Sequence, residues 1–164
     1  MQLIRKRALV ASLPVAAVAA FAAMAVASPP TPDLVIENLV AKADLNKRVR
    51  VNSDGIKLRT RGRTDVRVQT LTFPPGARTG WHHHPGIVIV AVQAGEVTVF
   101  SHHCKPRKYG PTSPNGAAFV ESGDHPMEVR NTGAAPAKVY ATFLAPNADP
   151  DGVFRIEDDV QTCA

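Results

Sequence analysis

Residues 76–95 read GARTGWHHHPGIVIVAVQAG, and this stretch carries most of what the sequence predicts about the fold. His82 and His84 are two positions apart, so on a β-strand both imidazoles point to one face while His83 points to the other. Residues 87–92 are apolar at every position, which predicts a central strand with neither face in water. The stretch therefore predicts a buried strand over 87–92, preceded by two histidines that share one face where they lie on a strand.

The rest of the chain alternates short apolar runs with turn-forming residues, and it holds 14 Pro and 11 Gly. Turn signals recur about every ten residues, and no long amphipathic helix is evident, which predicts an all-β antiparallel sandwich or barrel. The other expected strands cover 49–51, 56–60, 66–73, 95–100, 117–120, 127–131, 139–144 and 153–156.

Two segments are ambiguous. Residues 34–45 fit a helix and a strand about equally well. Within 66–73 the apolar positions change parity, from Val66 and Val68 to Leu71 and Phe73. Either a β-bulge near Thr70 or a polar interior along one half of the strand explains this change.

The first 27 residues have the pattern of an export signal. Arg5, Lys6 and Arg7 precede an uncharged apolar stretch, and Ala25-Val26-Ala27 supplies the small residues needed for cleavage after Ala27. The alternative is an uncleaved membrane anchor, but alanine inserts weakly and Pro14 interrupts the run. We therefore expect an exported protein, extracellular or in the cell envelope, without a stable membrane span after cleavage.

Removal of this signal would change the charge of the chain. The full chain has 19 Lys and Arg against 14 Asp and Glu, a net charge of +5, and three of the basic residues precede Ser28, which leaves +2. Residues 42–67 hold nine basic residues, but Lys57 and Arg59 alternate with apolar residues as on a half-buried strand. No aromatic side chains interleave with these cations, so we expect no nucleic-acid partner.

Cys104 and Cys163 are the two cysteines of the chain. In an exported protein an even count predicts a disulfide. This bridge would close a loop of about 60 residues and contribute about 4 kcal/mol. The alternatives are two free thiols, or Cys104 as a metal ligand beside His102 and His103.

The histidine pair is a weak signal when taken alone. Two imidazoles can bind one divalent ion, but a stable site usually has three or more protein ligands. A cluster of surface histidines explains His82 and His84 equally well.

The spacing around this pair resembles the first motif of the cupin family: Gly76, five residues, His82-x-His84, three residues, Val88, six residues and Gly95. Residues 116–133, which include Gly123-Asp124-His125-Pro126, resemble the second motif, and the likeness covers residues 66–144. The chain is most similar to small exported cupin proteins of actinobacteria, in which a mid-loop and a C-terminal cysteine recur. The resemblance implies a single cupin-type double-stranded jelly-roll β-barrel, often with a metal inside it.

Two positions depart from the family pattern. Val88 stands where the family has a glutamate ligand, and Met127 stands where it has a histidine ligand, so half of the usual cage is missing. His125 lies two residues before Met127 and shares its strand face if the strand extends that far. We therefore predict a weak site for Zn, Ni, Cu or Fe(II) at His82, His84 and His125. The alternative is a barrel that has lost its metal.

The neighbouring side chains have default structural roles. Met127 is expected to fill the core. Trp81 is expected to be a core residue, with an aromatic at the barrel mouth as the alternative. After the signal we expect a leader or first strand over 28–48 and the barrel over 49–164.

Three functions follow from these observations. The first is an exported barrel that binds a small apolar or mixed ligand, with a metal-assisted or a purely apolar interior. The second, implied by the resemblance, is a metal-dependent dioxygenase or isomerase, but Val88 leaves no general base evident at the motif. The third is docking on anionic envelope material through Lys57, Arg59, Arg61 and Arg63. Many barrels of this kind pair through sheet edges, so a homodimer stays open.

Overall fold

The computed structural model describes residues 35–103, 105–146 and 153–159, and every regular element in these ranges is a β-strand. The strands are β1 (Ile36–Leu45), β2 (Arg50–Ser53), β3 (Ile56–Arg59), β4 (Thr64–Phe73), β5 (His82–His83), β6 (Ile87–Ala94), β7 (Val97–Ser101), β8 (Arg107–Tyr109), β9 (Ala118–Glu121), β10 (Met127–Arg130), β11 (Ala137–Pro146) and β12 (Ile156–Glu157). Within these ranges no helix is long and apolar enough to cross a membrane. The all-β prediction is confirmed.

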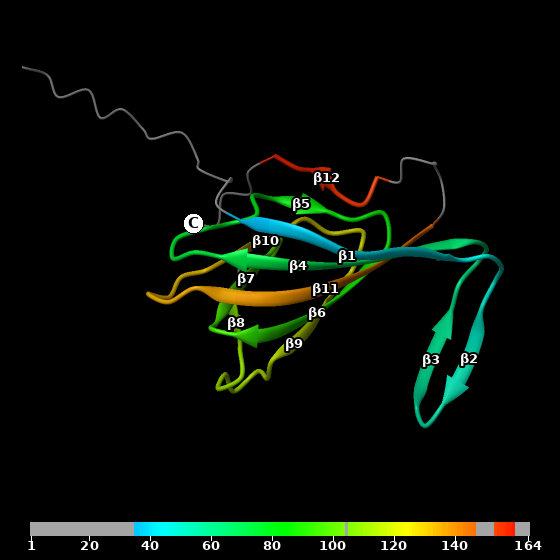
Figure 1. Ribbon diagram of the computed structural model, residues 1–164, viewed down its shortest axis with the longest axis horizontal. Helices are drawn as coiled ribbons and strands as arrows, with labels where there is room; N and C mark the ends of the chain where they lie inside the picture. The colour runs from blue at the N-terminus through cyan, green and yellow to red at the C-terminus, as the bar shows by residue number, and fades with distance from the viewer. Residues whose placement is uncertain (1–34, 104, 147–152, 160–164) are drawn as a thin grey trace, which may run out of the picture.

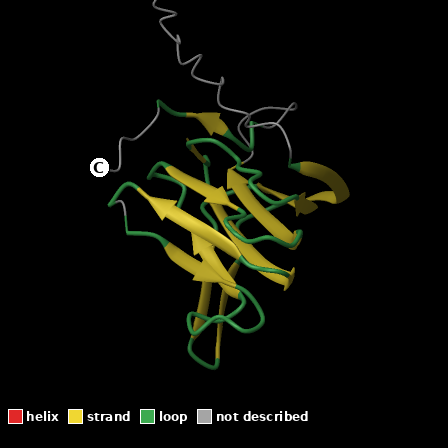
Figure 2. Ribbon diagram, turned by 90° about the vertical axis from the view of Figure 1, so that its left-hand side faces the viewer, coloured by secondary structure: helices red, strands yellow, loops and turns green. Residues whose placement is uncertain are grey.

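Two five-stranded antiparallel sheets make up the body of the molecule (Figures 1 and 2). Their strand orders are β1-β4-β11-β6-β9 and β12-β5-β10-β7-β8. From β4 onward the chain passes back and forth between the sheets, since β4, β6, β9 and β11 lie in one and β5, β7, β8, β10 and β12 in the other. This alternation is the cupin-type double-stranded jelly roll. Strand pairing among the described residues does not join the two sheets into one.

The hydrophobic core lies between the two sheets. Inward-facing side chains of both sheets contribute to it, and Phe73, Val88 and Val97 are almost completely buried. Burial of each such side chain stabilises the fold by about 1.5 to 3 kcal/mol. The core therefore holds together the strands that carry the candidate site residues.

Strand β6 corrects the prediction for residues 87–92. It pairs with β11 and β9, so it is central as expected. However, Val88, Val90 and Val92 are buried while Ile87 and Ile89 are 40% and 45% exposed. Two facing sheets cover only one face of each, so the outer face of β6 lies in solvent although its residues are β-branched.

Strand β4 resolves the parity change within residues 66–73. It pairs with β11 without any shift in register, so there is no bulge at Thr70. Arg67 and Gln69 line the same interior cavity as Leu71 and Phe73, which makes one half of the inner face polar. The polar-interior alternative is therefore correct. A register shift does occur, but in β1, between Leu39 and Ala41.

The N-terminal part of the described chain belongs to the first sheet. Of the ambiguous segment 34–45, Ile36–Leu45 form strand β1, which pairs with β4. Strands β2 and β3 form a separate hairpin that extends away from the sheets in Figure 1. The short strands β5 and β8 were not among the expected strands, because two or three residues give too little periodicity to recognise.

The segment that ends in β12 folds back over the sheet edge at β5. Ile156 and Glu157 pair with His83 and His82. The ring of Phe154 enters the core, 5.9 Å from that of Phe143 between centroids. This segment therefore covers the histidine motif.

Several predictions fall outside the described residues. The export signal over residues 1–27 and both cysteines, Cys104 and Cys163, lie there. The signal, the cleavage after Ala27 and the disulfide therefore stay predictions.

Candidate metal centre

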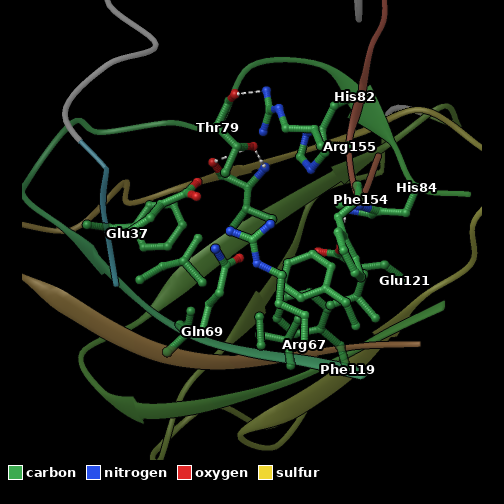
Figure 3. Close-up of a pocket in the computed structure, with 18 residues that line it drawn as sticks. Glu37, Arg67, Gln69, Thr79, His82, His84, Phe119, Glu121, Phe154 and Arg155 are labelled. Carbon is green, nitrogen blue, oxygen red and sulfur yellow. Dashed lines mark hydrogen bonds and ion pairs between the residues drawn. The ribbon is translucent and has the colours of Figure 1, made fainter. Parts of the chain in front are cut away.

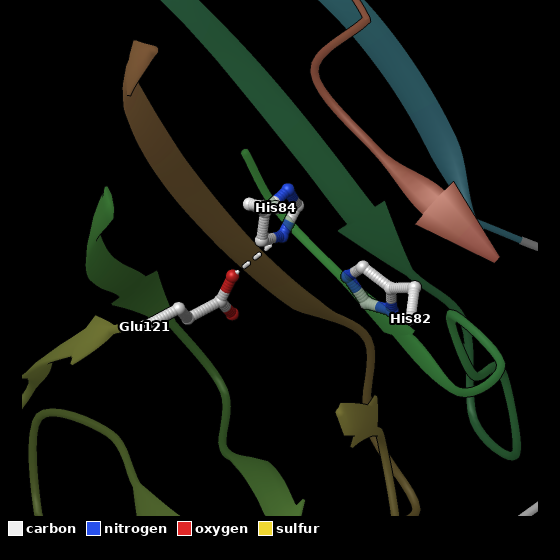
Figure 4. A group of neighbouring side chains, drawn as sticks. All are labelled: His82, His84 and Glu121. Carbon is white, nitrogen blue, oxygen red and sulfur yellow. Dashed lines mark ion pairs between the residues drawn. The ribbon is translucent and has the colours of Figure 1, made fainter. Parts of the chain in front are cut away.

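Three buried side chains meet inside the jelly roll: His82, His84 and Glu121 (Figure 4). One ligand atom from each lies within 4.8 Å of the others, and the residues are only 3%, 5% and 4% exposed. Nε2 of His84 lies 2.9 Å from a carboxylate oxygen of Glu121. Two imidazoles and a carboxylate at this spacing match the donor set of a transition-metal site.

Glu121 comes to this group through strand pairing. It is the last residue of β9, and in the antiparallel register it lies directly opposite Val88 of β6. Directly paired residues point to the same face of a sheet. Because Val88 points into the core, Glu121 does too, and it supplies the carboxylate that the first motif lacks at Val88.

Backbone carbonyls orient both imidazoles. Nδ1 of His82 donates to the carbonyl of Gly80 at 2.8 Å, and Nδ1 of His84 donates to the carbonyl of Phe154 at 2.5 Å. A carbonyl only accepts, so in each ring Nδ1 carries the proton and the lone pair of the neutral ring is on Nε2. This is how metal-binding histidines are commonly fixed.

The contact between His84 and Glu121 requires a positive charge. With its proton on Nδ1, the Nε2 atom of His84 is a buried acceptor without a hydrogen-bond donor, and it faces a carboxylate oxygen, which is also an acceptor. Buried acceptors in this position are costly unless a proton or a cation lies between them. The donor set and the orphaned nitrogen therefore fit a metal ion.

His82 is held in its neutral form. Burial and, to a smaller extent, the positive charge of Arg155 lower the pKa of its imidazole to about 4. At neutral pH the ring is therefore unprotonated and able to donate its lone pair.

The structure places the third predicted ligand elsewhere. His125 stacks on His102, with ring centroids 4.3 Å apart, and its side chain is 54% exposed. Strand β10 begins at Met127, so the strand does not extend back to His125 and the parity argument fails there. The structure therefore groups His82 and His84 with Glu121, and not with His125 as predicted from the sequence.

The two default core assignments agree with the structure. Met127 belongs to the core cluster, where it pairs in register with His82. Trp81 is buried and does not appear among the described residues that line the cavity.

A cavity of about 100 Å³ adjoins the three ligand residues (Figure 3). A cavity of about 150 Å³ holds a benzene molecule, so this one has room for about four to six non-hydrogen atoms. Apolar side chains form most of its wall, and its polar groups besides the three ligands are Glu37, Arg67, Gln69, Thr79 and Arg155.

The sequence contains a signal for Glu121 that lies outside the histidine motif. In the strand Ala118-Phe119-Val120-Glu121, Phe119 and Glu121 share parity. A buried Phe119 therefore implies an inward glutamate. The signal was hard to use because no sequence rule shows that this strand pairs beside Val88.

Neither a scan of protein-family models nor a search of curated proteins finds a match for this sequence. Solved structures do resemble it. A cupin domain from Bordetella pertussis Tohama I is 18% identical, with a TM-score of 0.46 over 68% of this chain and 94% of that one. A cupin superfamily protein from Desulfitobacterium hafniense DCB-2 is 11% identical, with a TM-score of 0.48 over 68% of this chain and 78% of that one.

The DMSP lyase DddQ from Ruegeria pomeroyi DSS-3 is 21% identical, with a TM-score of 0.46 over 56% of this chain and 42% of that one. At these identities the likeness concerns architecture alone. The strand order of this chain defines its fold as a cupin-type double-stranded jelly roll.

Proposed function

We propose that this protein binds a small ligand in the cavity of the jelly roll, next to a transition-metal ion held by His82, His84 and Glu121. The observation that carries the proposal is the buried Nε2 of His84, which has no hydrogen-bond donor and lies 2.9 Å from the Glu121 carboxylate. A divalent ion between these groups would satisfy both.

The donor set narrows the choice of metal. Two histidines and one carboxylate with open positions suit Fe(II), and the same ligands also bind Zn, Ni or Cu. When bound, the metal would supply a Lewis acid that polarises a ligand oxygen. The carbonyls of Gly80 and Phe154 hold the imidazoles in place, and the apolar wall limits the access of water.

A metal-dependent enzyme is the second candidate. The favouring observation is that three protein ligands border a cavity, so a small substrate would reach the metal. Besides Glu121, the described lining residues include one other carboxylate, that of Glu37, and Glu37 is exposed. With no buried base beyond the ligands among the described lining residues, binding remains the first proposal.

The β2–β3 hairpin favours envelope docking as a third candidate, for an exported form of the chain. Arg50, Lys57 and Arg59 are exposed on it, and it stands clear of the sheets (Figure 1). Arg63, by contrast, pairs with Asp44 at 2.5 Å. Binding to anionic vesicles that weakens steeply with salt would support this role, and salt-insensitive behaviour would contradict it.

The first test is the metal content of protein beginning at Ser28 and purified without a histidine tag. After loading with Zn, Ni, Cu or Fe(II), we expect about one ion per chain, measured by elemental analysis. The double variant His82→Ala/His84→Ala should lose the ion.

His125→Ala is the matched control, because it removes one imidazole outside the centre, and it should keep the metal. Retention of metal in the double variant, or absence of metal from the wild type under all four loadings, would contradict the proposal.

A further inference from the structure

Arg67 is a cation that faces the cavity without an anionic partner among the described residues. It comes from β4, is half-buried, and lines the same cavity as the three ligand residues (Figure 3). No carboxylate of the described chain lies within ion-pair distance of its guanidinium. A partly buried charge without a counter-ion is costly.

Two neighbours hold this guanidinium in place. Its central carbon lies 5.3 Å from the centre of the Phe154 ring. When the buried Gln69 amide is turned so that its oxygen faces Arg67, the orientation that its neighbours favour, this oxygen accepts from Nε at 3.2 Å and from Nη2 at 2.7 Å. A guanidinium carries five N–H donors, so this leaves the Nη1 side without an acceptor in the described part of the chain.

The other charged groups at the cavity are not available in the same way to bind an anionic ligand. Arg155 donates to the carbonyl of Thr79 at 2.5 Å and to the carboxylate of Glu157. Glu37 lies on an exposed strand position, and Glu121 faces His84. Arg67 is therefore the lining cation left to bind a ligand.

A carboxylate is the group that fits this arrangement. The planar fork of arginine binds carboxylates through two parallel hydrogen bonds, and stacking on an aromatic ring orients it. Phe119, Phe143 and Val90 line the same cavity and would contact an apolar ligand body. The cavity has room for about four to six non-hydrogen atoms.

We propose that the ligand is a small organic carboxylate, bound through Arg67 with its other end directed at the His82, His84 and Glu121 group. The inference rests on the proposed function, because it takes the metal ion to lie at the end of the ligand opposite the carboxylate. It adds the chemical class of the ligand and the residue that selects it.

The test compares propanoate with propanamide, which have the same number of non-hydrogen atoms and differ in charge. Both are titrated into zinc-loaded protein and followed by NMR shifts of cavity methyl groups. We expect propanoate to bind at least about tenfold more tightly, as one charge-assisted pair would give. Arg67→Met should remove this preference, so that propanoate binds no more tightly than propanamide.

Two further variants serve as controls. Arg59→Met removes a charge from the exposed hairpin and should leave the preference intact. Arg67→Lys keeps the charge but loses the fork, and it should bind propanoate at an intermediate level. If Arg67→Met does not fold, Arg67→Lys still tests the inference, because propanoate binding as tight as in the wild type would contradict a role for the guanidinium fork.

Zinc content, measured on the same samples, separates this inference from the metal proposal. Equal binding of the two probes to zinc-loaded protein would overturn the inference and leave the metal site standing. A preference that survives in Arg67→Met would also overturn it, because the carboxylate would then bind the zinc. Protein that holds no zinc but keeps an Arg67-dependent preference would support the carboxylate and exclude zinc as the metal of this site, and absence of Ni, Cu and Fe(II) as well would overturn the metal proposal.

Discussion

At the scale of single residues, the carboxylate of the candidate site comes from a different strand than the family pattern implies. The resemblance to cupins implies a glutamate ligand where this chain has Val88, and the carboxylate comes instead from Glu121, directly opposite on β9. The side chains of Val88 and Glu121 both point inward. A carboxylate on β9 can therefore reach the same part of the interior as a glutamate at position 88 of β6 would.

The pairing of Val88 with Glu121 predicts that a glutamate at position 88 can partly restore zinc binding when Glu121 is removed. Glu121→Val should weaken zinc binding by about 100-fold or more, because it removes one of three ligands. Adding Val88→Glu should recover at least about tenfold, since the new carboxylate starts from the paired position. Isothermal titration calorimetry with zinc would measure both changes. A double variant that binds no better than Glu121→Val would show that the site needs Glu121 itself.

His82 predicts how the metal-free protein responds to acid. Its pKa is about 4 in the folded state and 6.5 for an unperturbed histidine. As the pH falls from about 6.5 to 4, the unfolded chain binds a proton at this position and the folded chain does not, so stability falls. The loss is on the order of 3 kcal/mol.

Urea unfolding in the presence of a chelator would measure it. The variant His82→Gln should show a shallower pH dependence, and the difference between the two curves reports this residue alone. Parallel curves between pH 6.5 and 4 would contradict the assignment.

At the scale of elements, backbone packing fixes the loop that carries His84. A Cβ atom on Gly123 would lie 2.0 Å from the carbonyl oxygen of Gly86 and 2.5 Å from that of His84. These are backbone atoms, so they cannot move aside cheaply. The turn before β10 and the end of the histidine motif therefore pack directly against each other.

Gly123→Ala should for this reason disturb both stability and metal binding. We expect a loss of about 1 to 3 kcal/mol, typical of overpacking, together with weaker zinc binding. Gly62→Ala is the control, because a Cβ there has no neighbour within 4 Å, and it should change stability by less than about 0.5 kcal/mol. Urea unfolding of the two variants compares them, and equal stabilities would contradict the packing argument.

Strand β4 shows how one element serves two purposes. Its C-terminal half contributes Leu71 and Phe73 to the core, and its N-terminal half contributes Arg67 and Gln69 to the cavity wall. The change of parity in the sequence was therefore a sign of a binding surface and not of a backbone irregularity.

At the scale of the whole molecule, the ligand residues join parts of the chain that are far apart. His82 and His84 belong to the β5 region, Glu121 to β9 in the other sheet, and Phe154 fixes His84 from the segment before β12. An ion bound by these residues would hold both sheets together and would be absent from the unfolded chain.

Zinc should therefore stabilise the whole fold. At a free zinc concentration 100 times the Kd, the expected gain is about 2.7 kcal/mol. Urea unfolding with and without zinc measures the gain, with His82→Ala/His84→Ala as the control that should show none. An equal response in both proteins would mean that zinc acts elsewhere.

The sequence by itself determined most of the strand content and the shared face of His82 and His84, because side-chain alternation and turn residues act over a few neighbouring positions. It also marked Val88 and Met127 as departures from the family pattern. Only the tertiary structure decided that Glu121 completes the site, that His125 lies outside it and that Arg67 faces the cavity. These facts depend on which strands pair and in which register, and such contacts join residues that are distant along the chain.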